Sequence, residues 1–260
     1  LVTMEKLTGM AATHVWPNGG SLKSFILNKG FTTSAKLSVI GNGSSNGVDT
    51  SRFNDEVLRK SVVEEVKKNI AYDPGCSYLL FVGRLVKDKG ICELVNVFRE
   101  MVKKDPLLRL VLVGQFEKSL DPLPTEIEKE ITHNNAIIHI YWTNKVEYYM
   151  SLANFFIFPS YREGFPNVLL EAGAMKLPVI CSNIGGNIDI VQHHQTGLIF
   201  ETYSETDLAE KINWALQNRL AMKEMAARLF EKVTTDYKRE KFWMAMNSQY
   251  KELLKTFSNT

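Results

Sequence analysis

The sequence predicts an α/β fold built on a doubly wound parallel sheet. From Tyr78 onward, short runs of β-branched and aromatic residues alternate with longer amphipathic segments, which is typical of repeated βα units. Turn-forming residues follow three of the expected strands, at Gly83, Gly114 and Pro159. Connections between parallel strands are right-handed almost without exception, and doubly wound sheets bind ligands at the carboxyl ends of their strands. These positions therefore predict a ligand crevice at one edge of the sheet.

Six strands are expected because each apolar run is short and bounded by turn residues. They lie near residues 78–83, 108–113, 136–141, 154–159, 178–181 and 197–200. Helices are expected near 90–104, 122–133, 145–152, 166–176 and 205–218, with shorter helical structure near 186–192. Apolar residues at helical spacing then continue over 219–257.

The region before the sheet predicts less regular structure. We expect a strand over 12–16, a short helix over 20–28, a strand over 36–40 and a polar helix over 54–71. Residues 1–35 are too few to form a domain of their own.

Composition indicates an ordinary globular protein. The chain has 260 residues, of which 45% are hydrophobic and 23% charged, and its formal charge of +2 gives no global field of the kind that attracts nucleic acid. Three cysteines without a C-x-x-C spacing favour a reducing compartment, so we expect a cytoplasmic protein. No apolar run approaches the roughly 20 residues of a membrane span.

Two carboxylates stand on either side of a predicted strand-to-helix turn. Glu163 follows a buried strand, and Pro166 falls in the expected first helical turn, where proline is favoured. The free N–H groups and dipole of that helix would attract an anion such as a diphosphate. Glu171, about one and a half turns further on, can face the same cleft. The alternative interpretation is a pair of surface acids of which Glu163 merely favours the helix dipole.

Two cations are expected on the same side of the sheet. Arg84 directly follows a predicted strand, and Lys89 precedes the next helix. A guanidinium binds phosphate oxygens through two parallel hydrogen bonds, while an ammonium acts as a mobile point charge. The pair could neutralise a leaving diphosphate, whereas the simpler alternative is a solvated basic loop.

Other motifs argue against a dinucleotide or metal site and add one candidate turn. The glycine-rich loop at 41–47 is not the G-x-G-x-x-G dinucleotide fingerprint, and no helix is expected directly after it. The sequence contains no D-x-D, and its histidines lack metal-ligand spacing, so we expect no metal site. The turn at Gly185–Gly186 is a second candidate beside the crevice, and the alternative interpretation is an ordinary turn with no ligand.

Together these motifs resemble the C-terminal, donor-binding domain of retaining glycosyltransferases of family 4, which have the GT-B fold. The resemblance covers residues 36–257 and rests on the order Gly83-Arg84, Lys89-Gly90, Glu163-x7-Glu171 and Gly185-Gly186. Residues 39–49 and 121–124 are similar to the branch that builds bacterial capsule, O-antigen and related lipid-linked glycans.

The resemblance implies a nucleotide-sugar site, with the sugar transferred in retained configuration and without metal or other cofactor. Arg84, Lys89 and Glu163 would be catalytic: the cations would bind the diphosphate, and Glu163 the sugar hydroxyls. Glu171 would bind the ribose of a donor that we expect to be a UDP-sugar. The implied donor-binding residues are Gly83, Gly164, Phe165, Pro166, Asn167, Val168, Leu169 and Glu171.

The resemblance also implies how the chain is divided. Residues 1–35 would be the tail of a mostly missing acceptor domain, residues 36–239 the nucleotide-sugar-binding domain, and residues 240–260 a crossover helix. The acceptor would be a glycan or a lipid-linked glycan, which would allow peripheral association with the inner face of the plasma membrane. A nucleotide-sugar-binding module without transfer activity and a GT-B epimerase or phosphorylase remain alternatives. Relative to many members, Asn154 replaces aspartate and Asp189 replaces glutamate.

Overall fold

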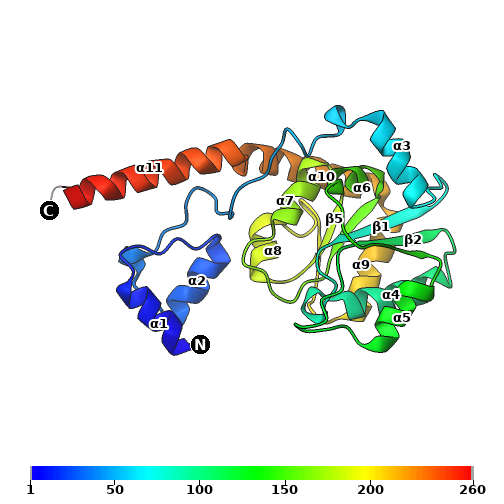
Figure 1. Ribbon diagram of the computed structural model, residues 1–260, viewed down its shortest axis with the longest axis horizontal. Helices are drawn as coiled ribbons and strands as arrows, with labels where there is room; N and C mark the ends of the chain where they lie inside the picture. Colours follow the sequence, from blue (N-terminus) through cyan, green and yellow to red (C-terminus); the bar gives the residue numbers. More distant parts are fainter. Residues whose placement is uncertain (1, 259–260) are drawn as a thin grey trace.

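A computed structural model describes residues 2–258 and confirms the predicted fold class (Figure 1). Six parallel strands form one sheet in the order β3-β2-β1-β4-β5-β6. The strand order reverses between β1 and β4, which is the position where doubly wound sheets open a ligand crevice. The strands are β1 (Ser77–Val82), β2 (Leu108–Val113), β3 (Ile137–Ile140), β4 (Phe155–Phe158), β5 (Val179–Ser182) and β6 (Leu198–Phe200).

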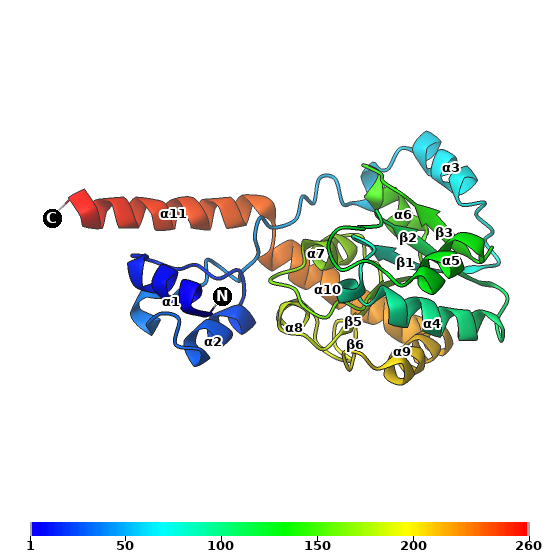
Figure 2. The same cartoon turned by 60° about the horizontal axis from the view of Figure 1, so that its bottom comes forward.

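Helices cover both faces of the sheet (Figures 1 and 2). One face carries α4 (Ile91–Val102), α5 (Thr125–His133) and α9 (Glu205–Gln217). The other carries α3 (Lys60–Asn69), α6 (Val146–Leu152) and α7 (Asn167–Ala174), with α10 (Arg219–Asp236) packed on α7.

The core is continuous across the central strands. In β1, the side chains of Leu79, Leu80 and Phe81 have no exposed surface. Strands buried on both faces consist almost entirely of apolar residues, because no position faces water. That property explains why the central strands β1, β4 and β5 agree with their predicted ranges to within one residue at each end.

The N-terminal segment lies beside the sheet domain and under the last helix (Figure 2). It contains α1 (Val2–Ala11) and α2 (Gly20–Asn28), and α11 (Arg239–Ser258) runs back along it. The indole N–H of Trp243 donates to Oδ1 of Asn46 at 2.8 Å, and the ring of Tyr250 meets Trp16 edge-on with centroids 5.0 Å apart. Helix α11 thus connects the two parts of the molecule.

Three predictions for this region were wrong or incomplete. The expected strands at 12–16 and 36–40 reduce to one bridge between Val15 and Leu37, because neither segment has a sheet edge to join. Helix α1 was not predicted. The polar helix expected over 54–71 begins only at Lys60, after a separate 3-10 turn over Asp55–Val57.

The domain boundaries at residues 35 and 239 stay predictions, although a helix break does separate α10 from α11. No helix within residues 2–258 combines the length and apolar character needed to cross a bilayer.

Candidate functional site

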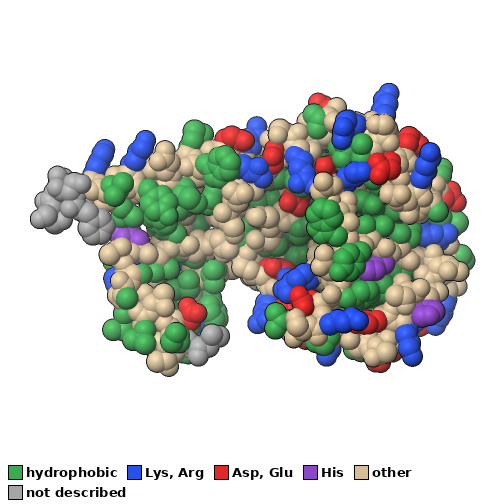
Figure 3. Space-filling model, viewed as in Figure 1, with side chains coloured by type: hydrophobic (Ala, Val, Ile, Leu, Met, Phe, Trp, Pro, Cys, Tyr) green, Lys and Arg blue, Asp and Glu red, His purple; other side chains and the backbone are tan. Residues whose placement is uncertain are grey.

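A cleft of about 650 Å³ lies between α2 and the carboxyl edge of the sheet. Its charged side chains all belong to the sheet domain, whereas α2 contributes one serine and two apolar residues. Figure 3 shows the molecule hollowed between these parts. The lining residues are Ser21, Leu22, Phe25, Asp88, Lys89, Arg162, Glu163, Gly164, Gly185 and Gly186.

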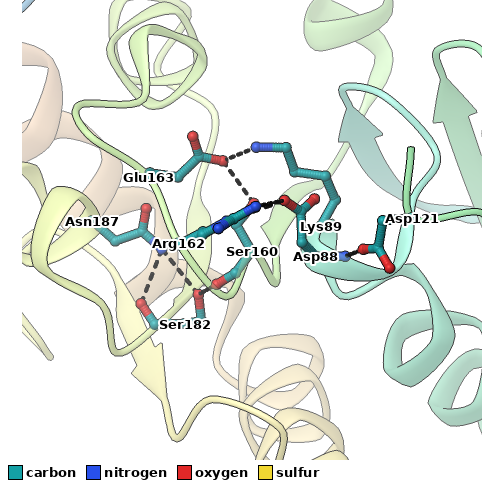
Figure 4. Close-up of polar contacts among 8 residues, drawn as sticks. All are labelled: Asp88, Lys89, Asp121, Ser160, Arg162, Glu163, Ser182 and Asn187. Carbon is teal, nitrogen blue, oxygen red and sulfur yellow. Dashed lines mark hydrogen bonds and ion pairs between the residues drawn. The ribbon is translucent and has the colours of Figure 1, made fainter. Parts of the chain in front are cut away.

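Lys89 and Glu163 form an ion pair inside the cleft (Figure 4). The Lys89 ammonium lies 2.5 Å from Oε1 of Glu163, and each side chain is only 16% exposed. The hydroxyl of Ser160 donates to the same oxygen at 2.7 Å. Lys89 follows β1 and Glu163 follows β4, so the pair stands at the point where the strand order reverses.

The backbone of Gly90 positions Lys89. Gly90 adopts φ +68°, and a Cβ atom there would lie 2.1 Å from the carbonyl oxygen of Pro159. Only glycine combines this left-handed conformation with so close an approach to the end of β4. The backbone N–H of Tyr161 also donates to the carbonyl of Asp88 at 2.8 Å, which fixes the two loops side by side.

A buried hydroxyl and amide network supports the floor of the site. Ser182 donates to the backbone carbonyl of Ser160, and the amide of Asn187 donates to the carbonyl and hydroxyl oxygens of Ser182 at 3.0 and 3.1 Å (Figure 4). The network joins the ends of β4 and β5 to the short helix α8 (Gly185–Ile190). Sequence reasoning missed Ser182 and Asn187; the available signal was a polar residue ending an otherwise apolar strand.

Arg84 and Glu171 do not line this cleft. Arg84 is exposed and lies near Glu117, whose pKa is lowered first by hydrogen bonds from Ser119 and also by the Arg84 charge. Burial raises the pKa of Glu171 to about 7, against the opposing effect of the nearby Arg52. Of the four predicted charged residues, the structure therefore brings together Lys89 and Glu163.

Glu171 instead adjoins a second polar cluster. The guanidinium of Arg52 pairs with Glu147 at 2.8 Å and donates to the carbonyl of Asn144 at 2.8 Å. Arg239 pairs with Asp49 at 2.9 Å, and its charge also reaches Glu171. The cluster lies beside the loop that follows β3.

Apart from Gly83, the remaining predicted donor-binding residues occupy the turn and first helical turn after β4. Gly164 lines the cleft, while Phe165 is buried against Tyr237 with ring centroids 5.6 Å apart. Pro166 is the residue before α7 and not part of its first turn, which corrects the sequence prediction by one position.

Further along, Oδ1 of Asn167 accepts a hydrogen bond from Ser44 at 3.3 Å. Val168 is half-buried, and Leu169 is fully buried in the core. Gly83 directly follows β1, and its N–H donates to the carbonyl of Val113 at 2.9 Å. No cluster of three or more metal-ligating side chains occurs among residues 2–258.

Residues 62–234 match the family described as glycosyl transferases group 1. The chain belongs to this family. The matched residues cover most of the sheet domain and include both Lys89 and Glu163.

Among individual relatives, the chain is 31% identical over 257 residues to the capsular polysaccharide biosynthesis glycosyltransferase CapM of Staphylococcus aureus, covering 98% of this chain and 66% of CapM. It is 25% identical over 181 residues to an Escherichia coli UDP-Gal:α-D-GlcNAc-diphosphoundecaprenol α-1,3-galactosyltransferase, covering 69% of this chain and 45% of that enzyme. The chain thus spans less than two thirds of the length of these relatives.

Solved structures show the same GT-B architecture. A glycosyltransferase of Rickettsia africae superposes with a TM-score of 0.85 at 20% identity, covering 97% of this chain and 67% of that one. HepE of Anabaena, solved with UDP-glucose, gives a TM-score of 0.82 at 18% identity, covering 98% and 66%. At these identities the likeness concerns the fold.

Proposed function

We propose that this chain is the donor-binding part of a retaining glycosyltransferase that uses a nucleotide-diphosphate sugar. The longer protein would transfer the sugar to a growing surface polysaccharide or a lipid-linked glycan. The observation that carries this proposal is the Lys89–Glu163 pair, which stands in a cleft at the switch point of a group 1 fold.

The two members of the pair suit opposite ends of the reacting bond. As the bond between the anomeric carbon and the diphosphate oxygen breaks, its electrons stay on the diphosphate, and the ammonium of Lys89 stabilises that negative charge. The carboxylate of Glu163 accepts hydrogen bonds from sugar hydroxyls and so orients the sugar. The acceptor hydroxyl forms the new bond on the same face, and its proton leaves with the departing phosphate oxygen.

Arg84 and Glu171 extend the proposed site beyond the cleft. Arg84 comes after the carboxyl end of β1, and Glu171 lies in α7, the helix that follows the carboxyl end of β4. We assign the outer part of the diphosphate to Arg84 and the ribose to Glu171, so the nucleotide would run along the carboxyl edge of the sheet from the sugar in the cleft. We assign no metal or other cofactor to the reaction.

The names of similar proteins support a UDP-sugar and a surface glycan. HepE was solved with UDP-glucose, the Escherichia coli relative is named for UDP-Gal and a diphosphoundecaprenol-linked acceptor, and CapM is named for capsular polysaccharide. We therefore propose a UDP-sugar donor and a cytoplasmic protein that meets its acceptor at the inner face of the plasma membrane.

A thermal-shift panel of UDP-, GDP- and ADP-sugars tests donor binding. A ligand that binds only the native protein raises Tm by mass action, so one nucleotide class should raise it selectively. Lys89→Ala should abolish the shift, while the exposed neighbour Lys87 provides the control Lys87→Ala, which should retain it. If none of these nucleotide-sugars shifts Tm, donor binding by this chain is refuted.

Two rival functions give different outcomes with the same donor. A binding module without transfer activity would bind the nucleotide-sugar but form no glycoside when the full-length protein is supplied with an acceptor. An epimerase would convert the nucleotide-sugar with no acceptor present. Transfer with retention, seen as an unchanged anomeric configuration by NMR, distinguishes the proposed enzyme from both.

A further inference from the structure

Helix α2 receives its N-terminal cap from a distant part of the chain. The residue that precedes the helix is Gly19, which has no side chain with which to cap it. The carboxylate of Asp189 accepts hydrogen bonds from the backbone N–H of Ser21 at 3.1 and 3.2 Å. It also accepts one from the Ser21 hydroxyl at 2.6 Å. The cap therefore joins the N-terminal segment to α8 of the sheet domain, 168 positions later in the sequence.

The two helices approach too closely for larger residues. A Cβ atom on Gly19 would lie 2.3 Å from Oδ2 of Asp189, and one on Gly185 would lie 2.9 Å from Cβ of Ser21. Both positions are glycine, so the contact between α2 and α8 is closely packed around the capping carboxylate.

The sheet-domain side of this contact is anchored independently. The ammonium of Lys232, on α10, donates to the backbone carbonyls of Asp189 at 3.2 Å and Ile190 at 2.7 Å. These bonds tie the end of α8 to the sheet domain. A change at the Asp189 carboxylate should therefore release α2 and leave α8 in place.

Both helices line the cleft. Gly186 of α8 lies on the side that also holds Glu163, since a Cβ atom there would lie 3.0 Å from the Glu163 carbonyl oxygen, and α2 forms a separate wall that meets α8 at Ser21. The α2 wall consists of Ser21, Leu22 and Phe25 and carries no charge. A charged donor finds its counter-charges on the sheet-domain wall, so the α2 wall is the side available to the acceptor.

We propose that Asp189 is a positioning residue that holds α2 in place as the acceptor-facing wall of the cleft. This inference rests on the proposed transfer function. Without the carboxylate, α2 would leave its position while the donor contacts of Lys89 and Glu163 stay intact. The rate at low acceptor concentration should fall, and donor affinity should not.

Hydrogen exchange tests the positional part without any substrate. Asp189→Ala should speed exchange of the α2 amides roughly 3- to 30-fold, the effect typical of losing a helix cap. Asp189→Asn and Ser21→Ala should give smaller increases, because each retains part of the contact. Exposed Asp73 caps the N–H of Gly75 at 2.8 Å in a distant turn, so Asp73→Asn is the matched control and should leave α2 unchanged.

Kinetics of the full-length protein test the functional part. Asp189→Ala should raise the KM for acceptor at least fivefold and leave the nucleotide-sugar Kd within twofold of the parent value. Unchanged α2 exchange in all three variants would overturn the positional role. Faster exchange with an unchanged acceptor KM would overturn the assignment of α2 to the acceptor. Failure of the parent protein to bind any nucleotide-sugar would instead refute the donor site, and the exchange experiment would still decide whether Asp189 holds α2.

Discussion

The Lys89 ammonium and the Glu163 carboxylate are 74 positions apart in the sequence and 2.5 Å apart in the structure. Neither charge is isolated before a ligand arrives, because each neutralises the other and Ser160 holds the shared oxygen. In the proposed donor complex, a phosphate entering the cleft would compete with the carboxylate for the ammonium. A carboxylate released in this way would be free to accept hydrogen bonds from sugar hydroxyls, so one exchange of partners would prepare both ends of the proposed donor.

Removal of either partner should impair the proposed transfer strongly. Lys89→Ala and Glu163→Ala should each lower kcat/KM by about 100- to 1000-fold, the range found when one preorganised electrostatic contact is lost. Steady-state kinetics with the full-length protein would measure this. The double variant should be less impaired than the product of the two single effects, because residues in contact are not additive.

Two exposed charged residues outside the cleft serve as controls for the general effect of removing a charge. Lys87→Ala and Glu126→Ala change exposed residues outside the cleft lining and should stay within twofold of the parent rate. Near-normal rates in both Lys89→Ala and Glu163→Ala would show that the pair has no part in catalysis.

Gly90→Ala should damage the fold and the site together. The new Cβ atom would lie 2.1 Å from the Pro159 carbonyl oxygen at a φ of +68°, so the loop after β1 must move away from β4. We expect a loss of about 2–4 kcal/mol in the free energy of unfolding, because strain at a left-handed position adds to a backbone clash. Urea denaturation would measure it, and nucleotide-sugar affinity should fall in parallel because Lys89 moves with the loop.

Gly30→Ala separates the effect of left-handed backbone strain from the effect of the clash with the Pro159 carbonyl. Gly30 has a similar φ of +62°, but a Cβ atom there meets nothing within 4 Å. This variant should lose only about 1 kcal/mol through backbone strain. Equal losses at the two positions would mean that the contact with Pro159 does not constrain the loop.

The parts of the fold that could be predicted are those determined by local pattern. Buried parallel strands such as 155–158 are apolar at every position, and a strand end fixes which edge of the sheet a residue such as Lys89 or Glu163 occupies. The parallel, doubly wound character of the sheet followed from the repeated βα pattern, whereas the order of its strands was not predicted. These features depend on a few consecutive residues and on the handedness of their connections.

The parts that could not be predicted depend on partners far away in the sequence. The segment 36–40 has strand-like residues but lacks a neighbouring edge, so only one bridge forms. The pKa of Glu171 depends on burial and on Arg52, which lies on a separate loop. The cap on Ser21 comes from Asp189, and no local signal in either segment indicates the other.

Helix α11 should hold the N-terminal segment through its aromatic residues. Trp243→Ala removes the hydrogen bond to Asn46, and Tyr250→Ala removes the ring contact with Trp16. Each should destabilise the docked segment by about 1 kcal/mol, because both side chains are half exposed. In limited proteolysis, cleavage of the chain within residues 30–46 should be several-fold faster in both variants than in the parent. The Tm of the sheet domain should stay close to the parent value.

The control for α11 is Met244→Ala, which truncates an apolar side chain that is 67% exposed on the same helix. Its cleavage rate should match that of the parent. Parent-like cleavage in both aromatic variants would show that α11 does not hold the segment in place.

Glu171 should make the stability of the protein depend on pH. Burial raises its pKa from 4.5 in the unfolded chain to about 7 in the folded one, so the folded protein binds more protons between these values. The free energy of unfolding must therefore fall as pH rises from about 4.5 to about 7, and stay lowered above that range. Glu171→Gln removes this titration. The free energy of unfolding of this variant, relative to that of the parent, should rise by roughly 1–3 kcal/mol between pH 4.5 and pH 7.5.

Urea unfolding of both proteins at half-unit pH steps would measure that difference. Exposed Glu126 provides the control, because Glu126→Gln should leave the parent pH profile unchanged. Arg52→Met should enlarge the fall in the free energy of unfolding with pH, because it removes the positive charge that lowers the pKa of Glu171 against the effect of burial. If the difference in free energy of unfolding between Glu171→Gln and the parent did not change with pH, Glu171 would be ionised throughout this range. The charges of Arg52 and Arg239 would then stabilise its carboxylate more than burial destabilises it.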